Sequence, residues 1–439
     1  MPDGTDEYGG LIALIHCDLG SILRCRSVPR SAFETQPTMT AGWVPSAQAR
    51  PPFGPSVRPN PFGPIGDIRL RPDPATRARV AADGRSSPLD LVICDLVQID
   101  GQPWGCCPRT FLRDALAELQ RELGARLLAS FEHEFQLLID APAPPPLSLD
   151  AQRSIDPFPM LAMAALSEAG VEPERFVPES APHQYEIPLA ATEGTTSADR
   201  SVTLRAVVRE VARRQGIRAT FTPLLDPTEP GNGVHIHLSL LDHHGSHLMY
   251  DATRPGCLSE LGSQFAAGIL AHAGALMALT APSPVSAARL RPGRRSAGTV
   301  CLGQRNREAL LRLPPILSLD GVSATGQLRL EYRGADAAAN PYLALGALVR
   351  AGLWGVRQRL SAPPIVDRDP PLLGGDTRGV GALPETLEGS LRALSEDTDV
   401  SGHMPRALYE VYAAVKQAEI DASAGRPLDE LCQRYAHIY

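Results

Sequence analysis

The alternation of apolar and polar residues predicts short strands at the start of the chain. From Leu11 to Glu34 the two kinds alternate around Asp18-Leu19-Gly20, a turn signal, so we expect a β-hairpin there. Residues 67–70 and 89–96 have the pattern of further short strands. The sequence therefore predicts a small β-rich domain over residues 1–104.

The rest of the chain mixes helical and strand patterns. Apolar residues recur at helical spacing in residues 108–123, 197–215, 259–279 and 340–359. Strand patterns occupy residues 125–139, 233–241 and 327–333, and the proline-rich residues 142–146 are expected to be a loop. Because strands and helices do not alternate regularly, the fold class predicted for the larger domain, residues 105–439, is α+β.

Composition narrows the classes of protein. The 439 residues are 43% apolar and 21% charged, as in a folded domain, and the net charge of −7 does not favour binding to nucleic acid. A membrane span would need about 18 consecutive apolar residues, and the sequence offers no such run. Residues 1–10 carry three acids and no base, the opposite of a secretory signal. We therefore expect a cytoplasmic protein with no nucleic-acid or membrane partner.

Cysteine and lysine usage excludes several kinds of site. The eight cysteines form no CxxC pair, which argues for reduced, mostly buried thiols instead of a zinc knuckle or a disulfide framework. The sole lysine, Lys416, lies in a helical pattern over residues 409–420. A P-loop needs a lysine after its glycines, and a pyridoxal enzyme needs one for its Schiff base. Any ATP chemistry must therefore rely on arginine and metal ions.

Acidic residues gather in three short motifs. Glu132 and Glu134 are two apart in a strand pattern, so both point to one face; taken alone, that face could simply be solvated. Glu179 and Glu186 lie in a polar segment, which taken by itself indicates a loop. Glu331 shares a strand face with Arg333, which on its own is consistent with a surface ion pair.

Histidines and arginines form two further groups. His235 and His237 share a strand face after Gly231-Asn-Gly, whose glycines allow close backbone approach; core histidines would fit equally. The arginines of interest are Arg289, Arg307, Arg312 and Arg333. Guanidinium forks bind carboxylate and phosphate oxygens in pairs, although a solvated basic loop is the alternative.

Together these groups describe one site. Five glutamates and a histidine can hold two hard divalent cations, and a carboxylate-rich site favours Mg²⁺ or Mn²⁺. Two such ions and several arginines can neutralise a nucleotide triphosphate and the charge on a transferring phosphoryl group. The combination predicts ATP-dependent phosphoryl transfer.

The order of the motifs resembles the glutamine synthetase family. That order is ExE, E-x6-E, GNGxHxH, NR-x4-R and ExR, followed by Asn340-Pro-Tyr. Asp18-Leu-Gly20, Val28-Pro29 and residues 67–73 resemble its N-terminal domain. The resemblance implies a β-grasp domain over residues 1–104 and a catalytic domain over residues 105–439 with a curved antiparallel sheet flanked by helices. It also implies a ring-shaped homo-oligomer with each active site between two subunits.

The resemblance also implies roles for individual residues. One metal ion would be bound by Glu134, Glu179 and Glu186, and the other by Glu132, His235 and Glu331. The implied catalytic residues are Arg307, Arg312 and Glu331, the two arginines addressing phosphate oxygens. Arg289, Arg333 and Gly231 would bind the substrate acid, and Ser239 together with Arg312 would bind the nucleotide.

Four positions depart from the family pattern. Pro230 stands where an asparagine is usual, and Val177 where a histidine helps to hold phosphate. Residues 35–66 contain no acid, whereas true glutamine synthetases use an aspartate of this domain to hold ammonium. Arg294-Arg295 replaces the flap glutamate that takes a proton from ammonium. Ammonium must be bound and deprotonated, so these losses weaken the case for ammonia as substrate.

Within the family, the chain resembles the γ-glutamylamide synthetase branch, and in particular enzymes of the γ-glutamylpolyamine synthetase kind. ATP would phosphorylate glutamate, and an organic amine would displace phosphate. The arginine-rich residues 281–307 favour a neutral or acid-bearing amine. Ordinary glutamine synthetase and a non-catalytic relative remain alternatives, the latter disfavoured because an idle cluster of carboxylates repels itself.

Overall fold

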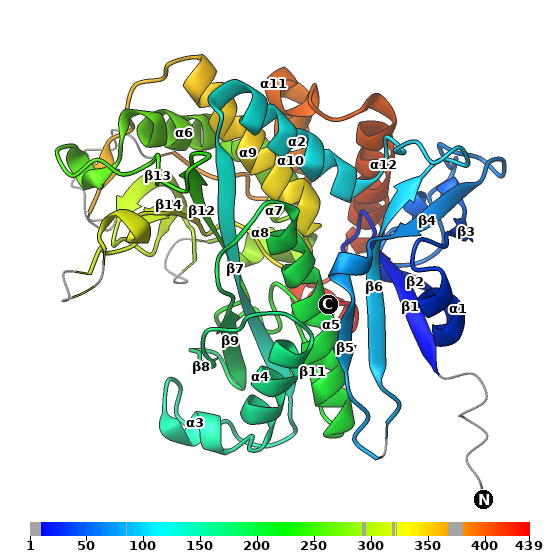
Figure 1. The fold of residues 1–439 in the computed structure, drawn as a ribbon. Coiled ribbons are helices and arrows are strands. Elements are labelled where there is room, and N and C mark those ends of the chain that lie inside the picture. The colour runs from blue at the N-terminus through cyan, green and yellow to red at the C-terminus, as the bar shows by residue number, and fades with distance from the viewer. Residues whose placement is uncertain (1–9, 85, 292–295, 318–320, 322, 368–380) are drawn as a thin grey trace, which may run out of the picture.

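The computed structural model describes residues 10–84, 86–291, 296–317, 321, 323–367 and 381–439. The N-terminal strands lie beside a larger sheet, and helix α5 (Thr195–Arg214) packs between them, in contact with β6 (Leu89–Val97) on one side and β7 (Arg126–Leu138) on the other (Figure 1). The fold is mixed α and β, with a small N-terminal domain and a large catalytic domain, as expected.

The N-terminal sheet has the strand order β2-β1-β6-β4-β3, with β5 paired to β6. Its remaining strands are β1 (Leu11–Cys17), β2 (Leu23–Pro29), β3 (Ala41–Trp43), β4 (Ile68–Pro72) and β5 (Ala78–Val80). The predicted hairpin forms between β1 and β2, and β1 runs parallel to β6. The end of the predicted hairpin is instead helix α1 (Arg30–Thr35), because Pro29 cannot donate to a further ladder bond and Phe33 turns into the core.

The catalytic sheet has the strand order β16-β13-β14-β15-β12-β7-β9-β8, and β10 and β11 also pair with β7. Its other strands are β8 (Val177–Pro178), β9 (Gln184–Pro188), β10 (Thr192–Glu193), β11 (Arg218–Thr220), β12 (Val234–Leu241), β13 (Thr299–Gln304), β14 (Ala309–Leu313), β15 (Leu330–Tyr332) and β16 (Ile365–Val366). Most pairs are antiparallel, but β13 is parallel to both β14 and β16, so one edge of the sheet is mixed.

Helices cover the catalytic sheet. They are α2 (Pro108–Leu123), α3 (Leu149–Arg153), α4 (Phe158–Glu168), α5, α6 (Glu260–Ala271), α7 (Ala273–Thr280), α8 (Pro284–Arg289), α9 (Pro341–Arg357), α10 (Leu387–Glu396), α11 (Thr398–Ser401), α12 (Arg406–Ser423) and α13 (Leu428–Ala436). Short 3₁₀ turns occupy Pro45–Ala49, Pro74–Thr76, Pro255–Cys257 and Thr325–Gln327. The predicted helix over residues 108–123 has the same bounds in the structure.

The single helix predicted over residues 259–279 forms two helices in the structure. Residues 259–279 form α6 and α7, which meet at His272 with a bend of 75°. The two helices pack on different neighbours. A Cβ on Gly268 of α6 would lie 2.1 Å from the carbonyl oxygen of Ala351 in α9, so α6 and α9 cross in direct backbone contact. Helix α7 packs on α10, which accounts for the change of direction between α6 and α7. Among the described residues no single helix has the length and composition of a membrane span; only this bent pair passes when taken together.

The turn of the first hairpin is fastened to the catalytic domain. Asn340, the N-cap of α9, donates from Nδ2 to the carbonyl oxygens of Cys17 (3.1 Å) and Asp18 (2.9 Å). Ser21 donates to the carbonyl of Ala339 at 2.7 Å, and Tyr439 donates to that of Gly20 at 2.6 Å. The Asn340-Pro-Tyr motif therefore joins the two domains.

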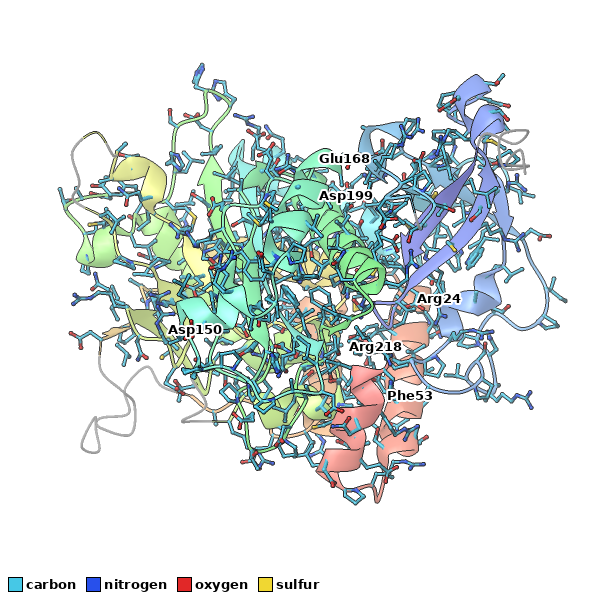
Figure 2. The ribbon with its side chains drawn as sticks, turned by 90° about the horizontal axis from the view of Figure 1, so that it is seen from below. Arg24, Phe53, Asp150, Glu168, Asp199 and Arg218 are labelled. Carbon is cyan, nitrogen blue, oxygen red and sulfur yellow. The ribbon has the colours of Figure 1, made fainter. Side chains whose placement is uncertain are left out.

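A buried ion network adds a second junction. Arg109 of α2 donates to both carboxylate oxygens of Asp199 (2.9 and 2.8 Å), to Asp95 of β6 (3.1 Å) and to Asp73 (2.7 Å). Asp199 lies on the side of the catalytic domain that faces the N-terminal sheet (Figure 2). All eight cysteines are free and six of them are buried, as expected.

Candidate active site

Strand β7 presents two glutamates to the site. Along it, Phe131, His133 and Phe135 are buried in the core, while the alternate residues Glu132 and Glu134 face the opposite side and are partly exposed. The strand period of two produces this division. The prediction that the two acids share one face is confirmed, and that face lines a cavity.

The sheet register brings the other motifs beside them. His235 of β12 is the partner of Glu132 on β7, and Glu186 of β9 is the partner of Glu134. On the other side of β12, His237 pairs with Glu331 of β15. Four adjacent strands thus place acids and histidines in one continuous patch.

Two groups of side chains have the spacing of metal ligands. One is Glu132, His235 and Glu331; the other is Glu134, Glu186 and His235; in each, one ligand atom per residue lies within 4.8 Å of the others. His235 Nδ1 is 3.2 Å from a carboxylate oxygen of Glu132, and Nε2 is 3.8 Å from one of Glu134. Glu179 lies in the same cavity, outside both groups.

The electrostatics of these acids fit a cation site. Burial, and then the charges of Glu132, Glu134 and Glu179, raises the pKa of Glu186 to about 9. Burial and the charge of Glu134 raise the pKa of Glu179 to about 7. Carboxylates crowded in this way repel one another, and bound divalent cations would relieve the repulsion. The oxygen-rich donor set with one imidazole fits Mg²⁺ or Mn²⁺.

Two more of the acids, Glu132 and Glu331, lie beside histidine or arginine side chains. Burial acts to raise the pKa of Glu132, but the adjacent imidazoles of His235 and His237 outweigh it and hold that pKa well below its usual range. Glu331 is also buried, yet the charges of Arg333, His235, His237 and Arg312 lower its pKa to about 2. Arg312 donates to one carboxylate oxygen of Glu331 and Arg333 to the other.

Arg289 is the most deeply held of the predicted arginines. It is 2% exposed, and its Nη2 donates to the carbonyl oxygens of Gly334 and Ala335, both at 3.0 Å. Its Nε lies 3.6 Å from the buried carboxylate of Asp336. A Cβ on Gly231 would lie 2.6 Å from the Cγ of Arg289 and 2.2 Å from the carbonyl oxygen of Pro223, so only glycine fits there.

A hydrogen-bond network fixes the loop before β12. Gln184 Nε2 donates to the carbonyl oxygen of Gly231 (3.0 Å) and to Oδ1 of Asn232 (2.9 Å). The backbone N–H of Gly233 donates to Glu134 at 2.7 Å. The glycine motif therefore orients Glu134, in addition to lining the cavity.

The predicted residues meet in two adjoining cavities. The larger, about 640 Å³, is lined by Glu132, Glu134, Glu179, Glu186, Glu331, His235, Gly231, Arg289, Arg307, Arg312 and Arg333, together with Val177 and Pro230. The smaller, about 240 Å³, contains Ser239 and shares Glu132, Arg175, His237 and Arg329 with the larger one. The predicted flap, Arg294-Arg295, lies outside the described residues.

Four residues of the site were not predicted to act in it: His237, Arg329, Arg175 and Gln184. For Arg329 the signal was available, since it lies two residues before Glu331 and so continues the face shared with Arg333. Arg175 and Gln184 lie in irregular sequence or at a strand start, and only the fold brings them to the cavity.

Models of two protein domains match the chain. The glutamine synthetase N-terminal domain matches residues 5–104, and the glutamine synthetase catalytic domain matches residues 105–435. A γ-glutamylpolyamine synthetase of Streptomyces coelicolor is 30% identical over 98% of this chain and 93% of its own length. A glutamine synthetase of Methanocaldococcus jannaschii is also 30% identical, over 81% of this chain and 80% of its own length.

A solved structure agrees with these matches. The crystal structure of a glutamine synthase homologue superposes with a TM-score of 0.91 at 42% identity, and the alignment covers 98% of both chains. Since the matches extend across both domains, this chain belongs to the glutamine synthetase family of ATP-dependent ligases.

Proposed function

We propose that this ligase joins glutamate to an organic amine, giving a γ-glutamyl amide through γ-glutamyl phosphate. One observation carries the proposal. The described acids that line the 640 Å³ cavity are Glu132, Glu134, Glu179, Glu186 and Glu331, and each of them is a proposed metal ligand. Among the described residues of this chain, no carboxylate in the cavity is left to hold an ammonium ion and take its proton.

The proposed metal ligands are Glu134, Glu179 and Glu186 for one divalent cation, and Glu132, His235 and Glu331 for the other. The close group Glu132, His235 and Glu331 supports the second set, and the closeness of Glu134 and Glu186 supports part of the first. Glu179 lines the same cavity, and its raised pKa, like that of Glu186, reflects the crowding of acids there. Bound Mg²⁺ or Mn²⁺ would supply positive charge against the phosphate oxygens of ATP.

The arginines divide between nucleotide and acid. We assign ATP to the smaller cavity, where Ser239 and Arg329 lie, with its phosphate oxygens extending into the larger cavity toward Arg307 and Arg312. Arg289, Arg333 and the backbone at Gly231 would bind the α-carboxylate of glutamate. Arg289 suits this role because its guanidinium is fixed by two carbonyl oxygens before any ligand binds.

The reaction has two transfers. A γ-carboxylate oxygen of glutamate bonds to the γ-phosphorus of ATP, and ADP leaves. The amine nitrogen then bonds to the acyl carbon, inorganic phosphate leaves, and the amine proton passes to solvent or to the departing phosphate. The protein's own residues contribute orientation and charge; the proposal assigns no described residue as a base for the amine.

The charge of the cavity favours an amine with further recognition groups. Six described arginines line it: Arg175, Arg289, Arg307, Arg312, Arg329 and Arg333. An ammonium ion entering such a site loses hydration without gaining a counter-charge. A larger amine can bind through the rest of its structure, and a neutral or acid-bearing one avoids repulsion by the arginines.

Synthesis of glutamine from ammonia is the second candidate, and the similarity to the M. jannaschii glutamine synthetase favours it. A non-catalytic role is opposed by the crowded acids, because a protein without metal ions would gain from losing them. The experiment that distinguishes the two ligase activities measures phosphate release with glutamate, ATP and Mg²⁺. The amines compared are ammonia and a panel of cationic, neutral and acidic organic amines. Mass spectrometry of the product identifies the amide.

We also propose that the protein forms a ring-shaped homo-oligomer. Within each chain, the boundary between the two domains would lie between residues 104 and 105. Support comes from the family relationship and from the N-terminal sheet, in which β3 pairs with β4 at the edge and several of the proline-rich residues 45–64 are exposed. Light scattering at micromolar concentration tests it: a fully active monomer would contradict it.

A further inference from the structure

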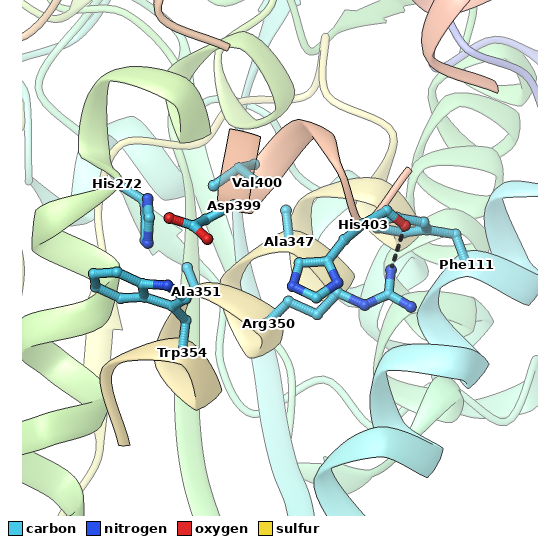
Figure 3. Close-up of a pocket in the computed structure, with 9 residues that line it drawn as sticks. All are labelled: Phe111, His272, Ala347, Arg350, Ala351, Trp354, Asp399, Val400 and His403. Atoms are coloured by element: carbon cyan, nitrogen blue, oxygen red, sulfur yellow. Dashed lines mark hydrogen bonds between the residues drawn. The ribbon is translucent and has the colours of Figure 1, made fainter. Parts of the chain in front are cut away.

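A second cluster of ligating side chains lies outside the catalytic cavity, at the bend between α6 and α7. There His272, Trp354 and Asp399 line a small cavity whose other end is formed by Phe111, Arg350 and His403 (Figure 3). The cavity has room of about 10 Å³, enough for roughly one water molecule or ion. None of these residues lines either of the two cavities assigned to ATP and glutamate.

His272 has one nitrogen bound and one without a partner. Its Nδ1 is 2.6 Å from Oδ2 of Asp397, while Nε2 is buried and forms no hydrogen bond in the described structure. The residue is 6% exposed, so bulk water does not satisfy Nε2. Most buried polar atoms in proteins have a hydrogen-bond partner, so Nε2 is available to a water molecule or an ion.

Asp397 and Asp399 complete the cluster. Asp397 caps α11, accepting the backbone N–H of Val400 on Oδ1 at 3.0 Å, which leaves Oδ2 to hold the imidazole. The carboxylate of Asp399 points toward the ring of His272 (Figure 3). These three residues can each place one ligand atom within 4.8 Å of the other two.

The positive charge of Arg350, which also lines this cavity, is neutralised by Glu118. Arg350 lies at the far end of the cavity, where its Nε donates to Glu118 at 3.1 Å and its Nη1 to the carbonyl oxygen of His403 at 3.5 Å. Arg350 therefore has its own counter-charge, and the end of the cavity between His272 and Asp399 is acidic.

We propose that this end binds a divalent transition metal of the Zn²⁺ type. Nε2 of His272 and the carboxylate of Asp399 are the protein ligands, and because Asp399 is exposed, solvent on its side supplies the water that completes the coordination. Asp397 holds the imidazole with its proton on Nδ1, as carboxylates do behind many histidine ligands of zinc. The imidazole favours Zn²⁺ over the Mg²⁺ expected at the glutamates of the catalytic cavity.

Such an ion would act as a structural clamp. It would join the α6–α7 bend to α11, two segments 125 residues apart in the sequence. A ligand that binds only the folded state raises the midpoint of thermal unfolding in proportion to the logarithm of its concentration. The site is therefore expected to affect stability and to leave the chemistry of the catalytic cavity unchanged.

Trp354 provides a local readout, because its ring centroid is 4.4 Å from that of His272. With excess Mg²⁺ present, micromolar Ni²⁺ should quench part of the tryptophan fluorescence of the full chain, and Zn²⁺ should compete with it and raise Tm. Trp354→Phe should lose the quenched component. Asp399 is exposed, so Asp399→Asn should fold normally while binding at least about tenfold more weakly; Asp397→Asn should lose about 10–100-fold.

The matched control is Glu396→Gln, which removes an exposed acid three residues before Asp399 and should leave both signals unchanged. Ligase activity in Mg²⁺ should be the same in Asp399→Asn and the unmodified chain. Equal Zn²⁺ and Ni²⁺ responses in Asp399→Asn and Glu396→Gln would overturn the proposal. So would the absence of any quenching or Tm shift, or metal responses abolished only by Glu134→Gln in the catalytic cavity.

Discussion

Arg329 donates a hydrogen bond from Nε to Nδ1 of His237, at 3.0 Å. A neutral imidazole that accepts on Nδ1 carries its proton on Nε2, which here lies 3.0 Å from a carboxylate oxygen of Glu132. A protonated nitrogen has no lone pair for a metal ion. Of the two histidines on β12, only His235 is therefore available as a ligand.

The two histidines should accordingly behave differently when replaced. His235→Ala should weaken Mn²⁺ binding by about 100-fold or more, because a direct ligand is lost. His237→Ala should keep the same number of bound ions with a smaller loss of affinity. Titration of each variant with Mn²⁺, followed by electron paramagnetic resonance, counts the ions. Equal losses in both variants would show that His237 is also a ligand.

Replacing an acid of the crowded group should abolish activity without harming the fold. Glu186→Gln should lower kcat/KM by about 100-fold or more with saturating Mg²⁺. In the metal-free protein the same change should raise the free energy of unfolding at pH 8 by about 1–3 kcal/mol, because the Glu186 carboxyl, whose folded pKa is about 9, must take up a proton on folding at that pH and glutamine need not. Glu388→Gln, an exposed acid on α10, is the control. Full turnover in Glu186→Gln would refute the metal assignment.

The metal-free protein should lose stability as the pH rises. The folded pKa values of Glu179 and Glu186, about 7 and about 9, exceed the ordinary glutamate value of 4.5. Between these limits the folded state binds more protons than the unfolded state, so the free energy of unfolding falls with increasing pH. Urea denaturation in a chelator from pH 5 to pH 9 should show this slope, and Glu186→Gln should flatten it. A slope unchanged by the substitution would show that Glu186 does not take up a proton when the protein folds.

Asp336 should position Arg289 for the substrate acid. Burial lowers the pKa of Arg289, and the charge of Asp336 opposes this effect. Asp336→Asn preserves the shape but removes the counter-charge, so we expect KM for glutamate to rise roughly tenfold, the equivalent of about 1.4 kcal/mol, with a smaller change in kcat. Asp429→Asn, an exposed acid on α13, serves as the control. An unchanged KM for glutamate would show that Asp336 does not position Arg289 for substrate binding.

Local periodicity was enough to predict much of the site. The spacing of Glu132 and Glu134 on one strand, and of Glu331 and Arg333 on another, fixed which side chains share a face. Neighbouring strands could not be inferred in this way. The pairing of His235 with Glu132 joins residues about a hundred positions apart, and only the folded sheet sets that register.

Long-range packing also explains the errors. The break at His272 depends on the backbone contact between Gly268 and Ala351, which no local pattern in residues 259–279 reveals. The parallel edge at β13 likewise depends on tertiary pairing with β16. Glu179 was grouped with Glu134 and Glu186 by family resemblance, and the structure places it in the same cavity but outside the close group of ligand atoms.

The central claim is that this site uses an organic amine in preference to ammonia. The most direct test is kcat/KM of the unmodified enzyme with glutamate, ATP and Mg²⁺, measured for ammonia and for each amine of the panel at one pH. The account predicts that at least one organic amine, neutral or acid-bearing, exceeds ammonia by about tenfold or more, with formation of the corresponding γ-glutamyl amide. A higher kcat/KM for ammonia than for every amine would contradict it and identify the enzyme as a glutamine synthetase.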